Sequence, residues 1–159
     1  MPNPSNWKHH SVEKPKNDDE YLERMSRVIL TAGLNWQMIE KKWPGIKKAF
    51  ADFNVDKVAK FQELEIEELM MNPDVIRNLA KIRAIVANAK TIKQLQAEYG
   101  SFDKYLDSLS KQGEDQMRDQ ISKTFAFLGK DTTVIFLFSV GQKLPKALAE
   151  WRVRHDKKA

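Results

Sequence analysis

The segment from residue 63 to residue 90 constrains the fold most, because two helix patterns follow each other there with a short break between them. Residues 63–71 read ELEIEELMM and predict a short helix, which Asn72, Pro73 and Asp74 end. The second helix is marked by apolar residues at spacings of three and four, as one buried helix face requires. They are Leu79, Ile82, Ile85, Val86 and Ala89. The segment therefore predicts two helices joined by a tight turn.

Basic and polar side chains gather where this second helix begins. Arg77 and Asn78 stand just before it, and Lys81 follows one turn later. The free backbone N–H groups and the dipole of a helix favour an anion at its N-terminus. These features make the hairpin a candidate phosphate site, with Arg77, Asn78 and Lys81 as the candidate ligands. The alternative is an ordinary helical hairpin with solvated charges, since short helix–turn–helix connections are common.

The composition is that of a soluble globular protein. The chain has 159 residues, of which 42% are hydrophobic and 31% charged. The longest apolar run, residues 134–138, is too short to cross a bilayer, and the polar N-terminus lacks the apolar region of a signal peptide. We therefore expect a cytoplasmic protein with no membrane partner. A net charge of +5 and a pI of about 9.3 permit a nucleic-acid partner without identifying one.

The chain contains no cysteine, which excludes disulfides, a cysteine nucleophile and a thiolate metal site. This absence fits a reducing compartment. Two of the three histidines, His9 and His10, are adjacent in a polar segment, where we interpret them as solvated. A closed zinc site needs four well-placed ligands. We therefore expect no metal and no cofactor.

Helix signals cover most of the rest of the chain. Residues 1–17 contain three prolines and predict a polar arm. Capping residues stand directly before several helix patterns, at Asn17, Asn35, Asn54 and Ser101. We expect helices over residues 18–32, 36–43, 44–50, 55–58, 102–109, 117–125 and 144–154, with Pro44 in the first turn of its helix and a polar loop at residues 111–115.

The segment GKDTTVIFLFSVG, residues 129–141, is rich in β-branched residues that would also suit a strand. No other convincing strand exists to pair with it, and an isolated strand cannot satisfy its backbone hydrogen bonds. We therefore expect a buried helix. The predicted fold class is all-α, a single domain of short helices over residues 18–159.

Four segments in the same order resemble the DNA-3-methyladenine glycosylase I family. TAGLNW at residues 31–36 resembles the family's QAG-[LF]-S-W, and IEKKWPGIKKAFADFNVDKVA follows it. The stretch MMNPDVIRNLAKIRAIVANAK resembles D-x-x-I-[IV]-R-[NH]-x-x-K-I-x-A-x-x-x-N-A-[KR]. Finally, FAFLGKDTTVIFLFSVG resembles F-x-F-[VL]-G-x-T-x-x-x-F-[ML]. The resemblance covers most of residues 18–141.

The resemblance implies a helical fold built around a helix–hairpin–helix element that holds a DNA phosphate. It places that element at residues 74–81, a pocket aromatic at Trp36, and a loop that wedges into the duplex at Gly33 and Leu34. A cationic alkylated base is attracted to an electron-rich ring such as that of Trp36. An apolar tip such as Leu34 can fill the gap that a base leaves in the stack. The alternatives are a tryptophan packed in the core and a packed loop leucine.

Several further residues are candidates for the site. Tyr21 is our second candidate for the base-binding pocket, and Trp7 and Trp43 are candidate further walls, although we interpret Trp43, which stands before Pro44, as structural. Diffuse attraction of DNA by Lys90 and Lys93 is possible, although solvated charges are the ordinary case.

The sequence departs from the family pattern in three ways. The family's zinc ligands are absent with the cysteines, and the H-[DN]-x-E-W-G run is missing from the arm. Val28 stands where the family has a pocket glutamate, eight residues before Trp36. Glu40 or Glu23 are possible substitutes, and each also reads as a surface charge. No catalytic residue is identified.

The expected function is that of a monomeric, monofunctional DNA glycosylase in base-excision repair. It would hydrolyse the N-glycosidic bond of an alkylated, 3-methyladenine-like purine in duplex DNA and leave an abasic site. One alternative is a non-catalytic relative that recognises damaged or abasic DNA, which Val28 favours. Another is a helical interaction module that does not bind DNA.

Overall fold

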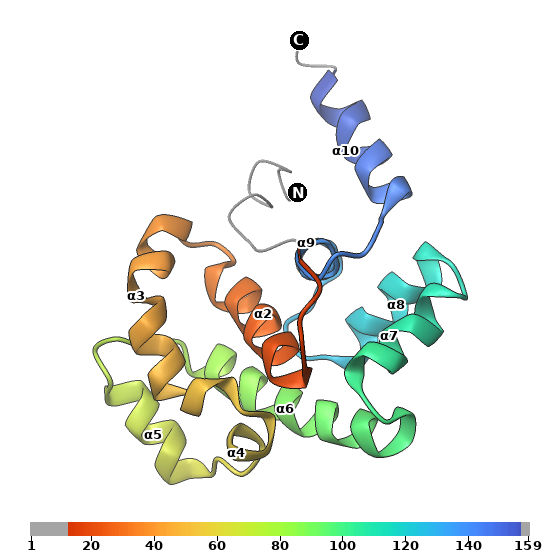
Figure 1. Cartoon of the computed structure of the whole chain (residues 1–159). Helices are drawn as coiled ribbons and strands as arrows, with labels where there is room; N and C mark the ends of the chain where they lie inside the picture. The colour runs from red at the N-terminus through yellow and green to blue at the C-terminus, as the bar shows by residue number, and fades with distance from the viewer. Residues whose placement is uncertain (1–12, 157–159) are drawn as a thin grey trace.

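All regular elements in the described part of the chain are helices (Figure 1). The computed structural model describes residues 13–156 and the side chains as far as Arg154. The elements are α2 (Asp18–Thr31), α3 (Trp36–Ala49), the 3₁₀ turn η1 (Ala51–Phe53), α4 (Val55–Ala59), α5 (Glu63–Met71), α6 (Leu79–Tyr99), α7 (Phe102–Ser110), α8 (Glu114–Thr124), α9 (Lys130–Ser139) and α10 (Pro145–Asp156). The expected all-α class, including the buried helix at α9, is confirmed.

Local signals in the sequence fix most helix starts. The side chains of Asn17, Asn54 and Ser101 each accept a hydrogen bond from the backbone N–H three residues later, at 3.0, 3.0 and 3.1 Å. Asn35 accepts from the backbone N–H of Gln37 at 2.8 Å. All four expected caps are confirmed, because a capping side chain acts within its own turn.

The expected break at Pro44 is wrong, because α3 runs through it as one helix. Ile39, Trp43 and Ile46 are buried on one face of α3 on both sides of Pro44, and Pro44 itself is exposed. Proline removes one backbone hydrogen bond from a helix. Burial of the continuous apolar face on both sides of Pro44 outweighs this loss.

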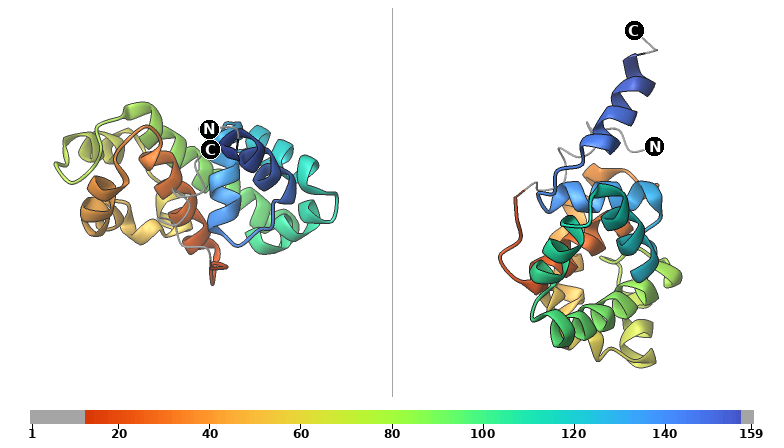
Figure 2. Two further views of the ribbon diagram at one scale, coloured as in Figure 1. Left: turned by 90° about the horizontal axis from the view of Figure 1, so that it is seen from above. Right: turned by 90° about the vertical axis from the view of Figure 1, so that its right-hand side faces the viewer.

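The long helix α6 packs against four other helices. It contacts α2, α4, α5 and α7, and α2 in turn lies against α9 (Figures 1 and 2). Four of the five predicted stripe residues are buried, namely Ile82, Ile85, Val86 and Ala89. The fifth, Leu79, is 40% exposed, since it begins the helix beside the hairpin turn. Phe102 is the middle of an aromatic cluster in the hydrophobic core, whose other members are Tyr21, Tyr105, Phe125 and Phe136.

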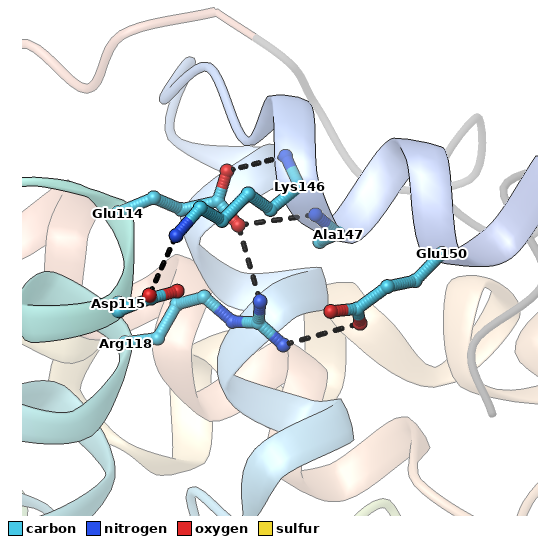
Figure 3. A network of polar contacts seen from close by, with 6 residues as sticks. All are labelled: Glu114, Asp115, Arg118, Lys146, Ala147 and Glu150. Carbon is cyan, nitrogen blue, oxygen red and sulfur yellow. Dashed lines mark hydrogen bonds and ion pairs between the residues drawn. The ribbon is translucent and has the colours of Figure 1, made fainter.

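The last helix, α10, rises away from the other helices and is held at its start (Figures 1 and 2). The carboxylate of Glu114 accepts hydrogen bonds from the backbone N–H groups of Lys146 at 2.8 Å and Ala147 at 3.0 Å. Arg118 donates to the same carboxylate at 3.1 Å and lies 4.0 Å from Glu150 (Figure 3). Glu114 belongs to the segment expected as a loop. It instead begins α8, because acidic residues suit the first turn of a helix.

The described end of the predicted N-terminal arm, residues 13–17, contacts the helices. Lys14 lies 3.1 Å from Asp103, and Pro15 is buried. Residues 1–12, which include Trp7, His9 and His10, lie outside the described residues. None of the helices between residues 13 and 156 has the length and apolar content needed to cross a membrane.

Candidate functional site

A cavity of about 430 Å³ opens between the end of α2, the start of α3 and α9. Three of the residues predicted from the sequence line it together: Gly33, Leu34 and Trp36. The remaining lining residues are Val28, Thr31, Ala32, Asn35 and Gln37 on the same stretch of chain, and Thr132 and Ile135 on α9. The cavity therefore joins two segments that are about a hundred residues apart in the sequence.

The loop between α2 and α3 presents Leu34 at this cavity. The helix ends as the N–H of Ala32 donates to the carbonyl of Val28 at 3.1 Å, and the N–H of Leu34 then donates to Thr31 at 2.9 Å. Gly33 has a φ of +78°, a conformation that other residues rarely adopt. Asn35 immediately caps the next helix, so the loop is short and Leu34 stays 40% exposed.

Trp36 and Trp43 occupy different environments on α3. Trp36 begins the helix, is partly buried and lines the cavity. Trp43 is 7% exposed and stacks on Phe53 with ring centroids 5.3 Å apart. Its indole N–H donates to Glu23 at 2.9 Å. Trp43 and Glu23 therefore form part of the packing between α2 and α3, away from the cavity lining.

Tyr21 is not among the residues that line this cavity. It is 1% exposed, and its ring centroid is 4.7 Å from that of Phe102. Its hydroxyl donates to the carboxylate of Asp103 at 3.1 Å. Burial, with the negative charge of Asp103, raises the pKa of Tyr21 well above its ordinary value of 10.0. This arrangement gives Tyr21 a place in the core.

The cavity wall is neutral over the part that the structure describes, because none of its described lining residues carries an ionisable side chain. Val28, at the position where the resemblance implies a glutamate, lines the cavity. Neither Glu23 nor Glu40 lines it. Glu40 is exposed, and Glu23 is held by Trp43 and by Lys47 at 3.3 Å. These walls can hold a flat apolar ring and offer it neutral hydrogen-bonding groups.

The hairpin between α5 and α6 is shaped by two asparagines. Asn72 accepts from the backbone N–H of Asp74 at 2.9 Å and tightens the turn. Asn78 accepts from the backbone N–H of Lys81 at 3.1 Å and caps α6. Arg77 is exposed just before the cap. The three predicted phosphate ligands therefore lie together at the start of a 21-residue helix.

The hairpin is bonded to the loop at the cavity, a link that the sequence did not indicate. The ammonium group of Lys81 donates to the carbonyl of Ala32 at 2.8 Å. Partial burial lowers the pKa of Lys81. On the other side of the turn, Lys42 donates to the carbonyl of Pro73 at 3.2 Å. Because an ammonium has three donors, the bond to Ala32 leaves Lys81 able to bind an anion as well.

The sequence also assigned no site residue to α9, although Thr132 and Ile135 form one wall of the cavity. Their spacing of three places them on one helix face, which was the available signal. No group of three or more potential metal ligands exists among residues 13–154, and the chain has no cysteine, so these residues do not fit a zinc site.

Comparison with known proteins gives consistent results. The chain is similar to the DNA-3-methyladenine glycosylase of Haemophilus influenzae, with 29% identity over 148 residues that cover 80% of each protein. Its fold is similar to a glutamate-to-glutamine mutant of 3-methyladenine DNA glycosylase I from Staphylococcus aureus. The TM-score is 0.74 at 28% identity, covering 89% of this chain and 88% of that one. The same values hold for a tyrosine-to-phenylalanine variant of such an enzyme in complex with 3-methyladenine.

The family described as methyladenine glycosylase has a model that matches residues 5–141, which is most of the chain. This protein belongs to the methyladenine glycosylase family.

Proposed function

We propose that this protein is a DNA glycosylase that releases 3-methyladenine-like purines from duplex DNA by hydrolysis of the N-glycosidic bond. One observation carries the proposal. In this member of the family, Trp36 and the Gly33–Leu34 loop line a cavity, and Lys81 of the helical hairpin donates a hydrogen bond to that loop at Ala32. One copy of residues 18–159 contains all three parts, so a monomer suffices.

The first step is binding of the DNA backbone at the hairpin. A phosphate at the start of α6 would meet the helix dipole and free backbone N–H groups. Arg77 and Lys81 supply positive charge there, and the amide of Asn78 has N–H donors left beyond its capping bond. Since these contacts involve only the backbone, they position the duplex without selecting a sequence.

The second step brings the damaged base out of the stack, because its glycosidic bond is inaccessible inside the duplex. Leu34, half-exposed on a short loop, would fill the space that the base vacates. The base would enter the cavity and lie against Trp36. Cation–π attraction favours an alkylated, positively charged purine over an ordinary base by about 0.5–2 kcal/mol.

The third step is hydrolysis. A cationic base is already a good leaving group, so the C1′–N bond can break without prior protonation. Its electron pair passes to the base, which leaves neutral. A water oxygen bonds to C1′ and loses its proton to solvent, which leaves an abasic site. The neutral cavity wall at Val28 is compatible with this class of substrate, whereas a neutral base would need an acid to protonate it.

The proposal is tested by measuring release of 3-methyladenine from methylated duplex DNA by the purified protein, with a chelator present. We expect release with the chelator. Trp36→Ala should lower release more than it weakens binding of duplex, while Trp36→Phe should retain most of the activity. Equal loss of both properties in Trp36→Ala would indicate a structural tryptophan.

A non-catalytic DNA-binding relative is the second candidate, and Val28 is the observation that favours it. In that case the protein would bind duplex with an abasic site more tightly than plain duplex and would release no base. Absence of any salt-dependent binding to DNA would contradict both candidates.

A further inference from the structure

Phe127 combines two unfavourable features at one residue. It lies between α8 and α9, its φ is +60°, and its side chain is 49% exposed. Among the described residues, the only other non-glycine residues with positive φ are the three of the η1 turn. A left-handed backbone is strained for a residue with a Cβ, and an exposed phenylalanine forgoes the burial that stabilises a fold. Strain of this kind is concentrated at functional positions.

The conformation is imposed by buried side chains on both sides of Phe127. The amide of Asn88, 1% exposed on α6, donates to the carbonyl of Ala126 at 3.1 Å and accepts from its N–H at 2.8 Å. The hydroxyl of Thr133, fully buried, donates to the carbonyl of Leu128 at 3.0 Å. The exposed ring is therefore presented by a fixed piece of backbone.

This fixed backbone is anchored beside the candidate site. Asn88 follows Lys81 by two turns, so both lie on one face of α6, about 10 Å apart along the axis. Lys81 holds the loop of Leu34, and Asn88 holds the segment of Phe127. The chain after Phe127 is also linked to the cavity. Thr133, which donates to the carbonyl of Leu128, directly follows Thr132, a residue that lines the cavity. Two exposed apolar side chains, Leu34 and Phe127, are thus fixed to the same scaffold.

We propose that Phe127 is a second apolar contact with DNA, which packs its ring on a nucleotide flanking the extruded base. This inference rests on the proposed function. The face of a base or of a deoxyribose is apolar enough for an aromatic ring to pack on it. Because folding already holds the loop in place, DNA would not have to order it, and the contact would position the strand.

The test uses Phe127→Gly and Phe127→Ala in the full-length protein, with duplex containing an abasic-site analogue as the ligand. Loss of one stacked ring should weaken binding about 5- to 100-fold. The dependence of affinity on salt should not change, because the side chain carries no charge. Phe127→Trp should retain affinity. Tyr99→Ala is the matched control, since Tyr99 is an aromatic residue, 37% exposed, at the opposite end of α6.

Thermal stability separates contact with DNA from a role in folding. Glycine tolerates a positive φ, so Phe127→Gly should melt no lower than Phe127→Ala while losing the same affinity. Variants that bind as tightly as the wild type would overturn the role of Phe127 alone. A wild-type protein that does not bind the duplex would overturn the proposed function together with it.

Discussion

At position 28 an aliphatic side chain closes the wall of the cavity that Trp36 also lines. A carboxylate there would be buried, and burial would raise its pKa unless a cationic base occupied the cavity. Such a group would interact with the positive charge of the substrate and of the developing sugar cation. Valine at position 28 therefore favours the stability of the protein with an empty cavity, whereas a carboxylate would stabilise the positive charge that develops on the sugar.

We predict that Val28→Glu accelerates release of 3-methyladenine in single-turnover measurements and lowers the free energy of unfolding by about 1–3 kcal/mol. Val28→Gln is the matched control, because glutamine has nearly the same size as glutamate but carries no charge. Equal rates for the two variants would show that charge at this position has no part in the reaction.

Tyr21 should make the protein sensitive to alkali. Its pKa is raised in the folded protein, whereas in the unfolded chain it titrates near 10.0. Unfolding therefore releases a proton once the pH exceeds that value, so stability is fully present below about pH 10 and falls as the pH rises further. We expect the melting midpoint to fall as the pH is raised above about 10, and to fall less steeply in Tyr21→Phe. Tyr105, whose pKa burial also raises, should keep part of the slope in that variant.

Among the elements, the hairpin and the loop at the cavity are joined through Lys81. This residue can contribute charge for phosphate and can also hold Ala32 in place. Arg77 is exposed at the same helix start and provides a comparison that involves charge alone.

We predict that Arg77→Ala and Lys81→Ala each reduce the slope of log affinity against log salt by about one. Only Lys81→Ala should also slow base release when the enzyme is saturated with DNA, because it frees the carbonyl of Ala32. If both variants slow release equally, the bond between hairpin and loop has no role in chemistry.

The elements also show what can be predicted from sequence. Helix starts at Asn17, Asn54 and Ser101 were predictable, because a cap acts over three residues. The continuous α3 was not, since packing on both sides of Pro44 overrode a local signal. The loop at Leu34 and the aromatic Trp36 followed from motifs.

The second wall of the cavity, at Thr132, was not predictable in the same way, nor was the bond from Lys81 to Ala32. Both are contacts between segments that are distant in the chain. Periodicity and caps describe each segment separately. They do not state which face of α9 meets α2, or which carbonyl a lysine reaches.

In the molecule as a whole, α10 is the helix of the described residues that packs least against the other helices. Its start is held by the carboxylate of Glu114, whose side chain is 7% exposed (Figure 3). The helix then extends away from the rest of the molecule (Figures 1 and 2). A carboxylate at a helix N-terminus satisfies backbone donors that otherwise have no partner.

We predict that Glu114→Ala accelerates hydrogen exchange of the α10 amides, with a loss of about 1–2 kcal/mol in local stability. Asp115→Ala is the control, because its ion pair with Lys146 is exposed. Unchanged exchange in Glu114→Ala would mean that other contacts hold α10.

The bond between Lys81 and Ala32 has a thermodynamic consequence. If a ligand in the cavity changes the affinity of the hairpin for DNA by some factor, then DNA changes the affinity of the cavity for that ligand by the same factor. A base bound in the cavity can favour the position of the loop in which Lys81 is bonded to Ala32. In that case, free 3-methyladenine would slow dissociation of the enzyme from an abasic duplex. The damaged strand would then remain covered until the base departs.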